Sequence, residues 1–105
     1  MVQDNPVGTG YSFVEDPNLL VKTDEEAATD LTTLLQEIFN RNSSLQESPL
    51  YIVAESYGGK FAVTLGLSAL KAIEAGKLKL KLGGIYIIIY LLSLVIINYV
   101  IFEIN

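Results

Sequence analysis

The sequence predicts an α/β domain in which helices alternate with the strands of a parallel sheet. Two segments with apolar residues at helical spacing flank an uninterrupted apolar run, Leu50 to Val53, and a third segment, Lys77 to Leu82, alternates between charged and apolar residues. Strands that alternate with helices are typical of a parallel sheet covered by helices. A chain of 105 residues has room for one domain at most.

The first helix is expected to begin after Thr23. Thr23 and Glu26 have the spacing of a capping box, in which the two side chains satisfy N–H groups at the helix start. The apolar face predicted for this helix consists of Ala27, Leu31, Leu34, Leu35 and Ile38, with Phe39 beside it. The triplet Asn42-Ser43-Ser44 that follows is a glycosylation acceptor if the chain enters the secretory route.

The run Ile52-Val53-Ala54-Glu55-Ser56-Tyr57-Gly58-Gly59 places a serine between an apolar strand and a helix. Ala54 and Gly58 are small, which lets strand and helix approach closely while Ser56 adopts a strained backbone conformation. In such a turn the serine is a nucleophile, and the backbone N–H of Tyr57 can stabilise an oxyanion. The alternative is a tight turn in which Ser56 only caps the helix and Glu55 is a solvated acid near the helix terminus.

The second helix is expected from Lys60 to Ala75 and to end at Gly76. Beyond it, Lys77, Lys79 and Lys81 alternate with leucines and indicate a half-buried strand that enters Gly83-Gly84, with the lysines on its solvent face.

Ile85 to Phe102 is a run of eighteen residues without a charge. Three interpretations compete. An uncharged span from Leu82 to Phe102 is long enough for a transmembrane helix, which would make a membrane the partner of this segment. A buried strand explains the β-branched residues Ile85 to Ile89. The third interpretation, which the abrupt change in composition favours, is an apolar tail (85–105) produced by translation beyond a domain that ends at residue 84.

Composition excludes several classes of site. The chain has neither cysteine nor histidine, so disulfides are excluded and a zinc site is not expected. Its net charge of -5 makes nucleic acid an improbable partner. We therefore expect no metal, no cofactor and no nucleic acid.

Two segments resemble the serine carboxypeptidases, most closely their plant serine carboxypeptidase-like branch. They are Asp4-Asn5-Pro6-Val7-Gly8-Thr9-Gly10-Tyr11-Ser12-Phe13 and Glu55-Ser56-Tyr57-Gly58-Gly59, and the resemblance covers residues 2–84. It implies the central portion of an α/β-hydrolase fold, in the order strand, helix, strand, elbow, helix, strand, with Met1 and Val2 where the first strand leads into Asp4.

The resemblance also implies a function and roles for three residues. The activity would be that of a serine-type carboxypeptidase, which releases C-terminal residues from peptides through an acyl-enzyme. Ser56 would be the nucleophile and Tyr57 the backbone oxyanion donor. Glu55 would bind the C-terminal carboxylate of the substrate while protonated, because two carboxylates in contact cannot both be ionised.

The chain also departs from the family pattern. It lacks the Trp-Asn-Gly-Gly-Pro-Gly type segment and the aspartate and histidine of the triad, so we expect a truncated polypeptide that is inactive on its own. The alternatives are a serine carboxypeptidase-like acyltransferase and a non-catalytic fragment anchored in a membrane by Ile85 to Phe102.

The expected location follows partly from the resemblance. Family members are secreted, vacuolar or lysosomal. Met1 is followed by Val2, Gln3 and Asp4 with no apolar signal region, so we expect the chain in the cytosol unless its tail enters a membrane.

Overall fold

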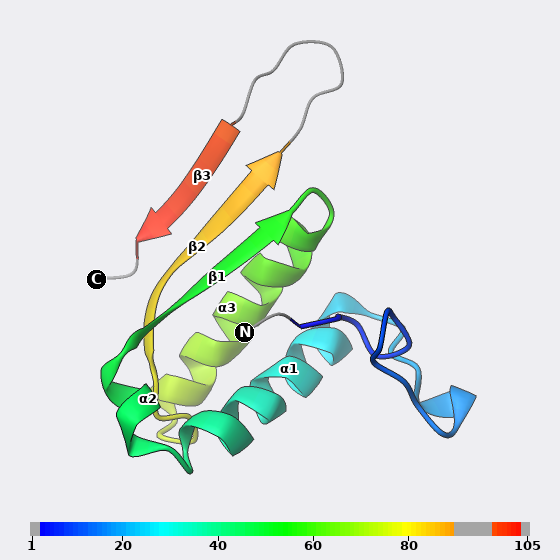
Figure 1. Ribbon diagram of the computed structural model, residues 1–105, viewed down its shortest axis with the longest axis horizontal. Coiled ribbons are helices and arrows are strands. Elements are labelled where there is room, and N and C mark those ends of the chain that lie inside the picture. Colours follow the sequence, from blue (N-terminus) through cyan, green and yellow to red (C-terminus); the bar gives the residue numbers. More distant parts are fainter. Residues whose placement is uncertain (1–2, 90–97, 104–105) are drawn as a thin grey trace.

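The computed structural model describes residues 3–89 and 98–103 (Figure 1). In chain order its elements are the 3-10 helix η1 (Pro17–Leu19), α1 (Asp24–Phe39), α2 (Ser43–Glu47), β1 (Pro49–Glu55), α3 (Gly58–Glu74), β2 (Lys81–Ile89) and β3 (Asn98–Glu103). The strands form one sheet in the order β1-β2-β3, in which β1 and β2 are parallel and β3 is antiparallel to β2. Helix α3 contacts both parallel strands, and α1 packs on α3. The predicted α/β class is confirmed.

Helix α1 begins where its capping residues predict. The Thr23 Oγ1 accepts a hydrogen bond from the Glu26 N–H at 3.1 Å. The Glu26 carboxylate in turn accepts from the Lys22 N–H at 2.6 Å, one residue earlier than in the usual capping box. The two side chains thus satisfy backbone donors just before and inside the first turn.

The predicted apolar face of α1 is confirmed, although it is wider than expected. Its members are buried or half-buried, and Ala28 and Thr32 are buried beside them. The Thr32 hydroxyl is buried without penalty because it donates to the Ala28 C=O, at 2.7 Å, and lies 2.8 Å from the Ser68 Oγ of α3. Small side chains therefore occupy the contact between α1 and α3.

Helix α3 runs from Gly58 to Glu74 and ends as predicted at Gly76, whose φ of 69° is in the left-handed region. The Gly76 N–H donates to the Ile73 C=O at 2.9 Å, and the Lys77 N–H donates to the Ala72 C=O at 2.8 Å. These two bonds form a Schellman motif, which satisfies carbonyls of the last turn and turns the chain back towards β2.

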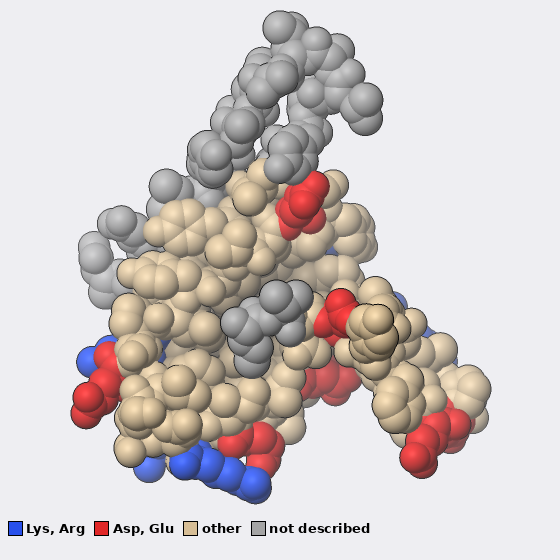
Figure 2. Space-filling model, viewed as in Figure 1, with Lys and Arg blue, Asp and Glu red and all other residues tan. Residues whose placement is uncertain are grey.

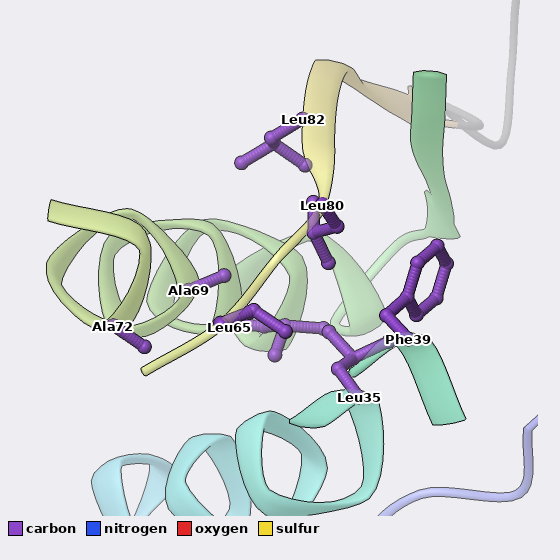
Figure 3. Packing of buried hydrophobic residues seen from close by; sticks show 8 residues of the cluster. Leu35, Phe39, Leu65, Ala69, Ala72, Leu80 and Leu82 are labelled. Carbon is purple, nitrogen blue, oxygen red and sulfur yellow. The ribbon is translucent and has the colours of Figure 1, made fainter. Parts of the chain in front are cut away.

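The core lies between the two long helices and the start of β2 (Figure 3). Leu78 is the most deeply buried large side chain, at 2% exposure. The other core residues are Leu35, Phe39, Leu65, Ala69, Ala72, Leu80 and Leu82. Asn40 joins the elements around this core, because its amide donates to the Lys77 C=O and accepts from the Lys79 N–H, both at 2.8 Å.

The alternation before β2 is confirmed by burial: the three leucines are buried and the three lysines are exposed. The strand itself starts only at Lys81. A bulge interrupts its pairing with β1 at Gly83, where a Cβ atom would lie 2.7 Å from the Tyr51 ring. Strand β2 then continues through Gly84 to Ile89.

The apolar segment after Gly84 is partly described. Ile85 to Ile89 belong to β2, which confirms the strand interpretation for these residues. The predicted transmembrane helix from Leu82 to Phe102 is not formed in the described parts of that span. Residues up to Ile89 belong to β2, and Asn98–Glu103 form β3. Among residues 3–89 and 98–103, no helix is long and apolar enough to cross a membrane. Residues 90–97 lie outside the described residues.

The first strand of the predicted order is not found in the described part of the chain. Met1 and Val2 lie outside it, and Gln3 to Asn5 form no strand. The sequence patterns also do not anticipate η1, α2 and β3.

The sheet face turned away from α3 carries apolar side chains in contact with solvent. Tyr51 is 50% exposed and Val53 is 65% exposed, and the ring of Tyr51 packs against that of Tyr86 at a centroid distance of 5.8 Å. Charged side chains are scattered over the molecular face in Figure 2, and uncharged surface occupies most of it.

Candidate functional site

Ser56 lies in the turn that joins β1 to α3. Its φ of 53° makes it the one residue other than glycine with a positive φ in the described part of the chain. A left-handed conformation costs an L-residue about 1–2 kcal/mol. The turn is held in place because the Ser56 N–H donates to the Ile88 C=O of β2 at 2.9 Å, one residue beyond the end of β1.

Backbone hydrogen bonds connect the turn at Ser56 to the start of α3. The Gly59 N–H donates to the Ser56 C=O, and the Lys60 N–H donates to the Tyr57 C=O, both at 3.0 Å. Within the described backbone, the Tyr57 N–H makes no such bond. Ser56 and Tyr57 are both exposed residues of this turn. A donor left over at a helix start can bind an anionic oxygen.

At the start of α3, the contact between the helix and the sheet is tighter at Gly59 than at the predicted Gly58. A Cβ atom at Gly58 would lie 3.6 Å from the Ala54 Cβ, an ordinary contact. At Gly59 it would lie 2.5 Å from the Ile87 Cγ2. The small residues Ala54 and Gly58 do face each other, and Gly59 is a further residue that must be small because of its contact with Ile87, which lies in a distant segment.

Lys60 connects the first turns of the two long helices. Its ammonium group forms an ion pair with Asp24 of α1 and lies 5.7 Å from the centroid of the Tyr57 ring. The hydrogen bond and the charge of Asp24 raise the pKa of Lys60 above its ordinary 10.5. The Tyr57 ring also packs edge-on against Phe61, at a centroid distance of 5.5 Å. The sequence offered no signal for this pairing, because a cation in one helix does not indicate which acid it meets.

Glu55 lies at the end of β1 and is exposed. It lines an open hollow of about 550 Å³ between α1, β1 and the first turns of α3. The apolar part of the lining includes Leu31, Leu34, Leu50 and Phe61. Glu55 is the carboxyl group in the lining, whereas Ser56 and Tyr57 are not part of it. Of the three predicted site residues, only Glu55 is among those that line this hollow.

The glycine-rich segment near the N-terminus reaches the same hollow. The Asp4 carboxylate accepts from the Tyr11 N–H at 2.9 Å, and the Ser12 hydroxyl donates to the Asp4 C=O at 2.7 Å. These bonds fold the segment into a compact loop. Gln3 and Asn5, on either side of Asp4, line the hollow together with Glu55. The two segments selected from the sequence therefore meet at one place.

The chemistry available at this site is limited by the residue types present. An exposed serine next to an unpaired N–H can form and stabilise a covalent adduct, but proton removal needs a base. The chain contains no histidine, and the raised pKa of Lys60 keeps its amine protonated. Within residues 3–89 and 98–103, no cluster of three acidic or other metal-binding side chains could hold a metal ion.

Comparison with known proteins adds independent information. The family model for serine carboxypeptidases matches residues 2–96. Serine carboxypeptidase-like 51 of Arabidopsis thaliana is 66% identical over 84 residues, which cover 78% of this chain and 18% of that protein. The retinoid-inducible serine carboxypeptidase of Homo sapiens is 42% identical over 82 residues, again 78% of this chain and 18% of that protein.

A third relative, the venom serine carboxypeptidase of Apis mellifera, is 34% identical over 84 residues, which cover 80% of this chain and 18% of that protein. The chain therefore spans about a fifth of the length of these relatives. No solved structure matches it.

The left-handed conformation of Ser56 predicts an unusual order of stabilities. Ser56→Gly should raise the free energy of unfolding relative to Ser56→Ala by about 1 kcal/mol, because glycine adopts a positive φ without the Cβ clash that alanine retains. Urea unfolding followed by circular dichroism measures the difference. A Ser56→Ala chain that is as stable as Ser56→Gly would contradict the turn geometry.

Proposed function

The chain belongs to the serine carboxypeptidase family, and from this we propose that it contributes the nucleophilic segment of a serine-type carboxypeptidase. The observation that carries the proposal is the left-handed Ser56 between β1 and α3. Backbone strain at a single polar residue is typical of catalytic turns. A serine that only caps a helix has no need of it, because a capping residue lies in the extended region.

In the proposed reaction, the Ser56 Oγ attacks the carbonyl carbon of the last peptide bond of the substrate. The C–O bond forms as the carbonyl oxygen becomes an oxyanion, which the Tyr57 N–H stabilises. The C–N bond then breaks, the C-terminal residue leaves as an amine with the proton taken from Ser56, and water hydrolyses the acyl-enzyme. Histidine, which carries this proton in Ser-His-Asp hydrolases, does not occur in these 105 residues.

Glu55 is proposed to recognise the chain end of the substrate. It directly precedes the nucleophile, so its carboxyl group lies on the same end of β1 as Ser56. It is also one of the residues that line the open hollow, together with Gln3, Asn5 and several apolar residues. A protonated carboxyl donates a hydrogen bond to a substrate carboxylate, which a charged one cannot do.

The first test concerns these 105 residues alone. The purified chain should hydrolyse a blocked dipeptide no faster than its Ser56→Ala variant, because loss of the histidine costs a serine hydrolase about a millionfold in turnover. Hydrolysis that depends on Ser56 would contradict the prediction. A matched Lys60→Met variant would then show whether the lysine serves as an alternative base.

The second test places residues 2–84 in an active, full-length serine carboxypeptidase, in exchange for the matching segment. In this chimera Ser56→Ala should abolish turnover. Glu55→Gln should retain substrate binding but weaken its dependence on acid pH, since an amide donates a hydrogen bond at every pH. KM measured against pH for both forms decides the role of Glu55, and identical profiles would show that Glu55 does not bind the carboxylate.

A further inference from the structure

Asn42-Ser43-Ser44 is the one triplet of the sequence in which asparagine is followed two positions later by serine or threonine. We propose that Asn42 carries an N-linked glycan when the chain is in the lumen of the secretory route. Such triplets accept glycans when the middle residue is not proline and the site is accessible. All three residues are exposed.

The side chains of the triplet are arranged for this chemistry. The Ser44 hydroxyl donates to the Asn42 Oδ1 at 2.7 Å, which engages the amide oxygen and leaves the nitrogen. Within the described residues, the Asn42 Nδ2 makes no hydrogen bond, so a sugar attached to it replaces no contact of the fold. Asn42 itself is extended, with a φ of -130° and a ψ of 96°, between α1 and α2.

Asn40, two residues earlier, provides the contrast. Both polar atoms of its amide are used, since Nδ2 donates to the Lys77 C=O and Oδ1 accepts from the Lys79 N–H. Asn40 is followed by Arg41 and Asn42, so it does not begin an acceptor triplet. One of these neighbouring asparagines therefore supports the fold, and the other presents its amide nitrogen to solvent.

The position of Asn42 keeps a glycan away from the candidate active site. Asn42 precedes β1, whereas Ser56 follows it, and a strand of seven residues extends about 20 Å. Figure 1 shows α2 at the opposite end of β1 from the turn into α3. A glycan at Asn42 would thus project from the far end of the molecule and leave Ser56 open.

The transfer uses a lipid pyrophosphate-linked oligosaccharide as the donor. A bond forms between the Asn42 Nδ2 and the first sugar carbon, and the bond from that carbon to the phosphate oxygen breaks. The lipid pyrophosphate leaves with the electron pair, and the amide nitrogen loses one proton to a base of the transferase. No oxidant or reductant is required.

The experiment translates the full 105-residue chain behind a cleavable leader peptide in the presence of microsomes. Only chains protected from added protease are scored, so that every scored chain has reached the lumen. We expect one gel shift that endoglycosidase H reverses. Asn42→Gln and Ser43→Pro should each abolish it. The proline variant should keep the fold, because Ser43 is the first residue of α2 and Asn42 already has the extended conformation that precedes proline.

Two further variants make the result decisive. Asn40→Gln should keep the gel shift, because Asn40 is not the acceptor. Leu20→Thr creates a second acceptor triplet at exposed Asn18 and should add a second shift. Lumenal wild-type chains without a shift, or a shift that survives in Asn42→Gln, would overturn the proposal.

Discussion

The hydrogen bond from the Ser56 N–H to the Ile88 C=O is the interaction on which the candidate site depends. It extends the pairing of β1 with β2 by one residue beyond Glu55, into a turn where Ser56 has a positive φ. The first turn of α3 holds the other side of the same residue through the bond between the Gly59 N–H and the Ser56 C=O. Strand pairing and helix formation together stabilise a conformation that the serine alone would avoid.

The rest of the molecule supports this turn from a distance. Gly59 lets α3 approach Ile87 of the neighbouring strand, and the ion pair of Lys60 with Asp24 joins the starts of both long helices. The core between the helices and β2 buries apolar side chains, and this burial holds the helices against the sheet. The same packing leaves one sheet face with exposed Tyr51 and Val53, so burial in the described residues is one-sided.

Local signals in the sequence were sufficient for much of this arrangement. Three features depend only on neighbours within a few positions: the helix cap at Thr23, the end of α3 at Gly76 and the serine between small residues. Such local signals can be recognised without knowledge of the fold. The ion pair of Lys60 and the contact of Gly59 with Ile87 depend on segments far apart in the chain. Strand β3 was missed because a continuous apolar run has no periodicity that separates a strand from a helix.

The backbone conformation of Ser56 can be measured directly. In isotope-labelled chain, a positive φ brings the amide proton of a residue close to its own Hα, which produces a strong intraresidue nuclear Overhauser effect. We predict that signal for Ser56, together with a scalar coupling across the hydrogen bond to the Ile88 carbonyl carbon. A weak intraresidue effect, as in helical or extended backbone, would contradict the strained turn and with it the assignment of Ser56 as a nucleophile.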